Sequence, residues 1–295
     1  MIPTVLGVAI LVFMLMHIVP GDPVEVLLGD TALPADRQAM REALGLHLPM
    51  WEQFQQFFIG LIHWDLGESF YNGRSVVEMI GERIPATFKL ALVAVGIAII
   101  SAGFLGLWAA THKNKWQDKL ALTCSMLLFS MPSFWLGPVL MIIFGLKLNL
   151  LPINGNEQWS SIILPAITLG AAMAAMTARL LRTSLLEVFN NDYIKTVRAK
   201  GGDSKLVNRH ALRNAMLPVV TIVFLQAGAL LTGAILTEAV FSWPGIGSLI
   251  VESIVKRDYP VVQGVVLFIT LVYMLMVLIS DIVYGFIDPR VRYNK

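Results

Sequence analysis

The sequence predicts an all-α membrane protein with six transmembrane helices, and three observations support this fold class. Of its 295 residues, 56% are hydrophobic and only 14% are charged, whereas about a quarter of the residues in soluble domains are charged. The apolar residues gather in six stretches that approach the length of about 20 residues that a spanning helix needs. Lysine and arginine concentrate in alternate connecting segments, as in multi-pass membrane proteins.

The third of the six apolar stretches is expected to be kinked. It contains Pro132 and Pro138, and a proline inside a spanning helix is tolerated, with a kink, where neighbouring groups satisfy the freed carbonyls. The fourth and fifth stretches are rich in glycine and alanine, which let helices approach closely, so we expect both inside the bundle. The stretches are residues 2–19, 88–110, 120–146, 162–181, 216–240 and 261–287.

The positions of the lysines and arginines predict the orientation in the membrane. They cluster in residues 111–119, 179–217 and 289–295, which fall on one side of a six-helix topology and therefore on the cytoplasmic side. Both termini are then cytoplasmic, and residues 20–86 form an extracytoplasmic insert after the first helix, which we expect to fold into a small helical cap. The net charge of +2, without a separate basic stripe, argues against nucleic-acid binding.

Three simpler features limit the other interpretations. Residues 1–19 resemble a signal peptide in length, but they lack a basic start and a small-residue cleavage site, so we favour a first span. Cys124 is the only cysteine, which excludes an intrachain disulfide and a cysteine metal cluster. The histidines are isolated, and the sequence has no metal-ligand cluster and no H-E-x-x-H motif of an intramembrane enzyme.

Residues 183–216, between the fourth and fifth stretches, have the pattern of two short helices around a glycine corner. Residues 193–200 have helical composition with an apolar face, and Gly201 and Gly202 interrupt them. Asp203 is a good N-cap for a second, basic amphipathic helix. One interpretation is that this segment lies on the anionic inner leaflet. The tight corner favours the other interpretation, a docking element that inserts into a cleft of a cytoplasmic partner.

Short motifs along the chain carry a resemblance to a known family. They are Ile2–Gly7, Pro20–Pro23, Ser130–Trp135, Asp192–Gly201, His210–Pro218, Phe241–Gly247, Arg257–Pro260 and Asp288–Arg290. Together they closely resemble ABC importer permeases of the dipeptide, oligopeptide, nickel and glutathione branch, in particular the B-type subunit of type I importers. That family usually carries alanine where this chain has Val197, and an apolar residue where it has Gly202, so we expect Gly202 to loosen the start of the second helix.

The resemblance implies a type I ABC importer transmembrane fold in the bacterial cytoplasmic (inner) membrane. Residues 1–86 would be the first transmembrane helix plus the extracytoplasmic cap segment. Residues 87–288 would be the ABC type-1 transmembrane core, with residues 183–216 as its cytoplasmic coupling loop, and residues 289–295 the cytoplasmic tail.

The resemblance also implies three sets of site residues and no metal site. The coupling loop of such permeases sits in a cleft of an ATPase subunit, and the alternative is that its charges are only solvated. The set for coupling to the ATPase is Tyr193, Arg198, Ala199, Lys200, Gly201 and Gly202. The kink of the third span is expected on the translocation path, with ordinary helix packing as the alternative. The set for the path is Met131, Pro132, Phe134 and Trp135.

The third set follows the fifth span and resembles a short re-entrant segment that closes the outer mouth. The set for this outer gate is Glu238, Trp243, Pro244 and Gly245. For Trp243, an aromatic anchor at the membrane interface is the alternative.

The implied function is that of a transmembrane permease subunit of an ATP-driven, binding-protein-dependent importer, which forms half of the translocation pathway for di- or oligopeptides or glutathione. The implied partners are a homologous second permease in a heterodimer, two cytoplasmic ATPase subunits, an extracytoplasmic solute-binding protein and membrane lipid. The chain has no G-x-x-x-x-G-K-[ST] phosphate loop. We therefore expect it to be no enzyme and to hold no cofactor, with ATP and magnesium bound by the partner subunits.

Two alternatives stay open. The same architecture also imports nickel or a metal chelate. A secondary carrier is the other alternative, although we find neither an inverted repeat nor a matched pair of interrupted helices.

Overall fold

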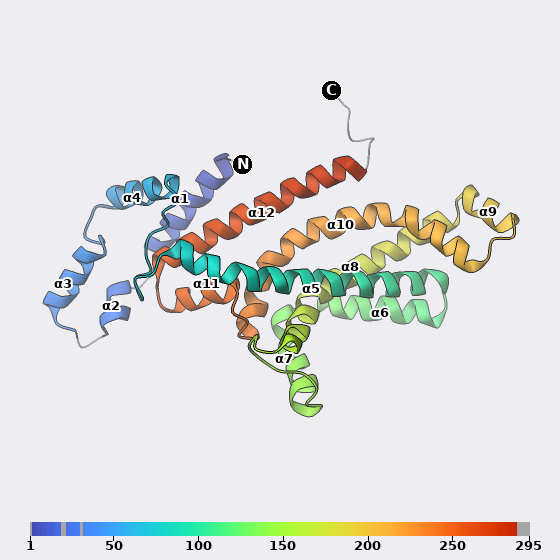
Figure 1. Ribbon diagram of the computed structural model, residues 1–295, viewed down its shortest axis with the longest axis horizontal. Helices are drawn as coiled ribbons and strands as arrows, with labels where there is room; N and C mark the ends of the chain where they lie inside the picture. Colours follow the sequence, from blue (N-terminus) through green and yellow to red (C-terminus); the bar gives the residue numbers. More distant parts are fainter. Residues whose placement is uncertain (1, 19–21, 30–31, 288–295) are drawn as a thin grey trace, which may run out of the picture. The chain divides into compact units, whose positions relative to one another are not determined.

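The computed structural model describes residues 2–18, 22–29 and 32–287. Apart from an isolated antiparallel bridge between Glu68 and Ser75, the regular elements of these residues are helices (Figure 1). They are α1 (Ile2–Ile18), α2 (Pro23–Leu28), α3 (Pro34–Ala43), α4 (Met50–Ile62), α5 (Val76–Thr111), α6 (Trp116–Ser130), α7 (Ser133–Leu140), the π-helical segment η1 (Met141–Lys147), the 3-10 turn η2 (Trp159–Ile162), α8 (Ile163–Phe189), α9 (Asp192–Ala199), α10 (Ser204–Val240), α11 (Ile246–Val255) and α12 (Tyr259–Ile287).

The all-α membrane fold that the sequence predicts is confirmed. Among the described residues, four helical segments are long and apolar enough to cross a membrane, and a bent pair of helices makes a fifth if it is one span. The four are Val76–Thr111, Trp159–Phe189, Ser204–Gly228 and Tyr259–Ser280, and the bent pair is Trp116–Ser130 with Ser133–Lys147. Helix α1 has 17 residues, which is near the lower limit for a spanning helix.

The third predicted stretch is broken rather than kinked. Its two halves, α6 and α7 with η1, meet at an angle of 109°. Met131 leaves the helical conformation (φ −82°, ψ 121°), because a residue that precedes a proline avoids the right-handed helical region. Pro132 is the N-cap of α7, and Pro138 lies inside α7. The prediction of a single kinked helix is therefore wrong at this point.

A second difference concerns the start of the fifth span. The second helix of the loop and the fifth stretch form one continuous helix, α10, of 37 residues with Pro218 inside it. A proline within a helix removes one backbone hydrogen bond, and α10 continues through it. The segment that follows the glycine corner is therefore a direct extension of a spanning helix.

The chain divides into two compact units, each of which is described by itself. Unit 1 comprises Met1–Phe88 and Ser242–Met274, and unit 2 comprises Lys89–Phe241 and Leu275–Lys295.

In unit 2, α8 packs against α6 and α10, and α9 lies at the far end of the α8–α10 pair (Figure 1). Of an 18-residue apolar window within Trp159–Phe189, the segment that contains α8, 78% is buried. A Cβ atom at Gly170 would lie 2.7 Å from the carbonyl oxygen of Ala94, and one at Gly106 would lie 2.9 Å from that of Ala178. Small residues thus allow α5 and α8 to approach closely, as the sequence predicts for the fourth stretch.

The fifth stretch is less uniformly enclosed than we expected. Only 22% of an 18-residue apolar window within Ser204–Gly228 is buried, whereas Leu230, Ala234 and Glu238 further along α10 are buried. The expectation of an interior helix therefore holds within this structure only for the second part of α10.

In unit 1, the predicted cap segment contains the helices α2, α3 and α4. The ring of Phe13 on α1 packs against two rings of α4, with centroid distances of 5.2 Å to Phe54 and 5.8 Å to Phe57. The buried carboxylate of Asp258 accepts hydrogen bonds from Ser69 Oγ (2.5 Å) and from the backbone N–H of Phe70 (3.0 Å). These contacts fix the end of the cap segment to the corner between α11 and α12.

Candidate functional site

The α9–α10 corner, residues 200–203, closes helix α9 with two backbone hydrogen bonds. The N–H of Gly201 donates to the carbonyl of Arg198 (3.0 Å), and the N–H of Gly202 donates to that of Val197 (3.0 Å). Gly201 has φ +83°, a left-handed conformation that costs little only for glycine. This is the Schellman arrangement, in which the orphan carbonyls of a helix end are satisfied. The glycine corner predicted from the sequence is confirmed.

Helix α10 starts directly after this corner. The side chain of Asp203 accepts a hydrogen bond from the backbone N–H of Leu206 (2.8 Å), so Asp203 is the N-cap. A Cβ atom at Gly202 would lie 2.8 Å from Val197 Cγ1 and 2.8 Å from the Val197 carbonyl oxygen. The start of α10 is capped here, and the expectation that Gly202 loosens it stays a prediction. The absence of a side chain at 202 leaves room for the side chain and the carbonyl group of Val197.

Helix α9, the corner and the first turns of α10 form a helical hairpin, and one face of this hairpin is anchored in an apolar cluster. Ile194 of α9 is fully buried against Leu181 and Leu185 of α8 and Val207 and Ala211 of α10. Burying a side chain of this size contributes about 1.5–3 kcal/mol. Helix α9 is thus anchored by apolar packing at the end of the α8–α10 pair.

The other face of the hairpin carries the predicted coupling residues. Arg198, Ala199, Lys200 and Gly201 are exposed, and Tyr193 is 39% exposed. The hydroxyl of Tyr193 accepts a hydrogen bond from Asn214 Nδ2 (2.7 Å), which joins α9 to α10. Within the described residues, no salt bridge engages Arg198 or Lys200. The structure therefore brings Arg198, Ala199, Lys200 and Gly201, for which coupling is predicted, together on one exposed, basic corner.

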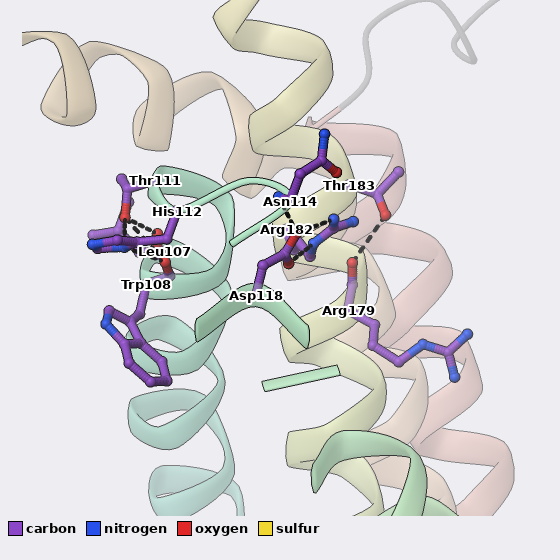
Figure 2. Close-up of polar contacts among 9 residues, drawn as sticks. All are labelled: Leu107, Trp108, Thr111, His112, Asn114, Asp118, Arg179, Arg182 and Thr183. Atoms are coloured by element: carbon purple, nitrogen blue, oxygen red, sulfur yellow. Dashed lines mark hydrogen bonds and ion pairs between the residues drawn. The ribbon is translucent and has the colours of Figure 1, made fainter. Parts of the chain in front are cut away.

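Figure 2 shows an ion pair that the sequence analysis missed, Asp118 of α6 with Arg182 of α8. Arg182 Nε donates to Asp118 Oδ1 (2.5 Å), and Arg182 Nη2 donates to Asp118 Oδ2 (2.7 Å). The backbone N–H of Asn114 also donates to Asp118 Oδ2 (2.9 Å). The sequence offers only a weak signal for this pair, a single acidic residue within a lysine-rich segment, and the two partners are 64 residues apart.

The predicted path residues gather at the break between α6 and α7. Met131 and Pro132 form the corner, and Phe134 and Trp135 follow in the first turn of α7. Phe134 is 55% exposed and Trp135 is 50% exposed. Half-exposed aromatic side chains argue against ordinary packing inside this chain, the alternative considered for Phe134.

The predicted outer-gate residues after α10 are buried in unit 1. Trp243 is 2% exposed, and its Nε1 donates to the carbonyl oxygen of Ala86 (3.0 Å). The backbone N–H of Ile246 donates to Thr87 Oγ1 (2.8 Å). Gly245 is buried and is the N-cap of α11, and Pro244 is half-buried. Because Trp243 is enclosed by protein, the alternative of an aromatic anchor in the lipid interface is wrong.

Glu238, the fourth predicted gate residue, belongs to unit 2 and is fully buried in the last turn of α10.

Comparison with known proteins bears on the whole chain. Residues 102–293 match the family model of the binding-protein-dependent transport system inner membrane component, and residues 1–91 match the model of its N-terminal part. The chain is 42% identical to the glutathione transport system permease protein GsiC of Pectobacterium atrosepticum and to that of Salmonella typhimurium, and 40% identical to that of Escherichia coli K12. Each comparison covers 100% of this chain and 96% of the relative. The chain is thus a multi-pass membrane protein of the binding-protein-dependent transport system inner membrane component family, a permease of an ABC importer.

Proposed function

We propose that this permease carries glutathione or a similar short peptide across the inner membrane as part of an ATP-driven importer. The observation that supports this solute is the 40–42% identity to the three GsiC proteins over the full length of the chain. None of these three relatives is named for nickel, so peptides are favoured over a metal chelate. Glutathione is itself a tripeptide, which places it within the solute class that the motifs suggest.

We also propose that the α9–α10 corner is where the ATPase subunit binds the permease. On the side of Ile194 the hairpin is packed in the apolar cluster, and on the side of Arg198 and Lys200 it is exposed. Two exposed cations that form no salt bridge with the described residues suit an acidic cleft on another subunit, and long-range charge complementarity guides such docking. Gly201 brings the backbone to the surface without a side chain, which allows close approach. The ATPase, with its ATP and magnesium, would then be a separate chain.

The remaining assignments follow from this arrangement. The corner faces the cytoplasm, residues 20–86 face the outside, and both termini are cytoplasmic, as the distribution of lysine and arginine favours. The complete assembly would contain this chain, a homologous second permease, two ATPase subunits and a solute-binding protein. The exposed Phe134 and Trp135 would face the second permease across the shared path, and the segment from Glu238 to Gly245 would close its outer end. Residues 1–86 would form the first transmembrane helix plus the cap segment, and residues 87–288 the transmembrane core.

Uptake by the reconstituted complex tests the solute. Proteoliposomes that contain the complete assembly, with ATP inside and the binding protein outside, would be given labelled glutathione, a labelled dipeptide or labelled nickel. We expect ATP-dependent accumulation of glutathione or the dipeptide. Accumulation of nickel alone, or uptake driven by a proton gradient without ATP, would contradict the proposal.

A further inference from the structure

Unit 1 contains a cavity of about 500 Å³ that none of the predicted site residues accounts for. Its walls come from α1, from the cap segment and from the start of α12. This volume lies within the range of about 300–1,000 Å³ that is usual for small-molecule sites. The cavity is also distinct from the break between α6 and α7, whose residues belong to unit 2.

Four aromatic residues line the cavity, Phe13, Phe57, Phe70 and Tyr259. Phe13 is 5% exposed. An apolar wall with a few directed polar groups is the usual design of a small-molecule site.

Both signs of charge are present among the lining residues. Arg41 forms an ion pair with Asp22, and the Arg41 side chain is still 50% exposed. A guanidinium group has five N–H donors, so this pair leaves donors for a second carboxylate. Asp65 is exposed at the cavity and uses Oδ1 to accept from the backbone N–H of Gly67 (2.9 Å). Its carboxylate retains acceptor capacity for a ligand ammonium group.

Amide groups complete the lining. Gln53, Gln56 and Gln263 contribute to the wall, and Nε2 of Gln53 also donates to the carbonyl oxygen of Leu48 (2.9 Å). An amide side chain both donates and accepts hydrogen bonds, which matches the alternating donors and acceptors of a peptide backbone.

These features select among the classes of ligand. A phosphate-like anion would meet two carboxylates and a single guanidinium, so repulsion would weaken its binding. A lipid chain would offer no hydrogen-bonding group to the remaining donors of Arg41 or the remaining acceptors of Asp65, and it would remove them from water, which costs free energy. A short zwitterionic peptide has a carboxylate for Arg41, an ammonium group for Asp65 and amides for the glutamines.

We infer that this cavity is a receiving site for a short zwitterionic peptide, occupied before the peptide enters the translocation path. The inference rests on the proposed function, because it takes the peptide as solute and the cap as extracytoplasmic. The site gives the permease a weak selectivity of its own, separate from that of the binding protein.

Direct binding to the permease–ATPase complex in lipid nanodiscs, without the binding protein, tests this site. The probe is tritiated glutathione. We expect saturable binding by the wild-type complex. Gln56→Trp should fill the cavity and lower the affinity about tenfold, which corresponds to about 1.4 kcal/mol of binding free energy. Gln55→Trp is the matched control, because Gln55 is an exposed neighbour on α4 that does not line the cavity. It should bind as the wild type does.

A second variant keeps the test valid if Gln56→Trp does not fold. Arg41→Gln should weaken binding of glutathione but not of its carboxyl-blocked diester, because only the free carboxylates need the guanidinium. Absence of saturable binding to the wild-type complex, or equal binding by the Gln55 and Gln56 variants, overturns the cavity site. If glutathione uptake by the complete assembly is normal in that case, the proposed function stands without the cavity site. If the cavity binds peptides but the assembly transports none, the proposed function fails instead.

Discussion

Asp118 and Arg182 form an ion pair with two hydrogen bonds, of 2.5 and 2.7 Å, that ties the start of α6 to α8. The Asp118 side chain is 3% exposed and that of Arg182 is 18% exposed. On α8, Arg182 lies between Leu181 and Leu185, which both pack in the cluster beneath Ile194 of the hairpin. The same turn of α8 thus carries the hairpin on one side and α6 on the other.

Loss of this pair should destabilise the protein. We expect Asp118→Ala to cost about 3 kcal/mol, because it leaves the Arg182 charge largely buried without its partner. The measurement is the thermal unfolding of the purified complex. Arg179→Ala is the matched control, since Arg179 lies one turn earlier on α8 and its guanidinium points away from Asp118 (Figure 2). A double-mutant cycle with Arg182→Ala should give a coupling energy of at least about 1 kcal/mol, and additive effects would contradict a direct pair.

A bulky residue at the glycine corner should uncouple transport from ATP hydrolysis. Gly201→Trp forces a side chain into a left-handed conformation and onto the exposed corner (φ +83°), so we expect ATP-dependent uptake to fall to background while the protein still reaches the membrane. Gly155→Trp is the matched control, because Gly155 also has a positive φ (+75°) and open space around it. Normal uptake by the Gly201 variant, or equal losses in both, would refute the docking role.

The close approach of Val197 to Gly202 can be measured as a coupling. Gly202→Ala should destabilise the hairpin by about 1–3 kcal/mol, because the new methyl group overlaps Val197 Cγ1 and the Val197 carbonyl oxygen. Adding Val197→Ala removes only the first overlap, so it should restore part of the loss. Gly103→Ala is the control: nothing lies within 4 Å of a Cβ atom there, so this change should be neutral or stabilising by about 0.4–1 kcal/mol. If the single and double variants unfold at the same temperature, the Val197 side chain does not limit the space at position 202.

Removing the indole hydrogen bond of Trp243 should weaken unit 1. Trp243→Phe loses the 3.0 Å bond to the carbonyl oxygen of Ala86 and part of the buried ring, so we expect a loss of about 1–3 kcal/mol. Trp159→Phe provides the comparison, because that indole is 79% exposed and its replacement should change the melting temperature little. Similar shifts for both variants would show that the buried bond contributes nothing.

Interactions between near neighbours in sequence could be predicted from the residues alone. The apolar stretches identified the spanning helices, and the glycines at 201 and 202 with Asp203 identified the corner and the next N-cap. Each of these features depends on backbone conformation or on partners within a few residues. The family motifs also depend only on order along the chain, which is why the resemblance and the comparisons agree.

Contacts between distant segments were decided only by the tertiary structure. Nothing in the sequence indicates that Asp118 pairs with Arg182 rather than with the nearby lysines, or that Trp243 is buried beside Ala86 rather than placed in lipid. The cavity beside Phe13 needs three segments to meet, and no local pattern encodes such a meeting. Periodicity and composition fix which residues avoid water, whereas the choice of neighbours depends on how whole helices pack.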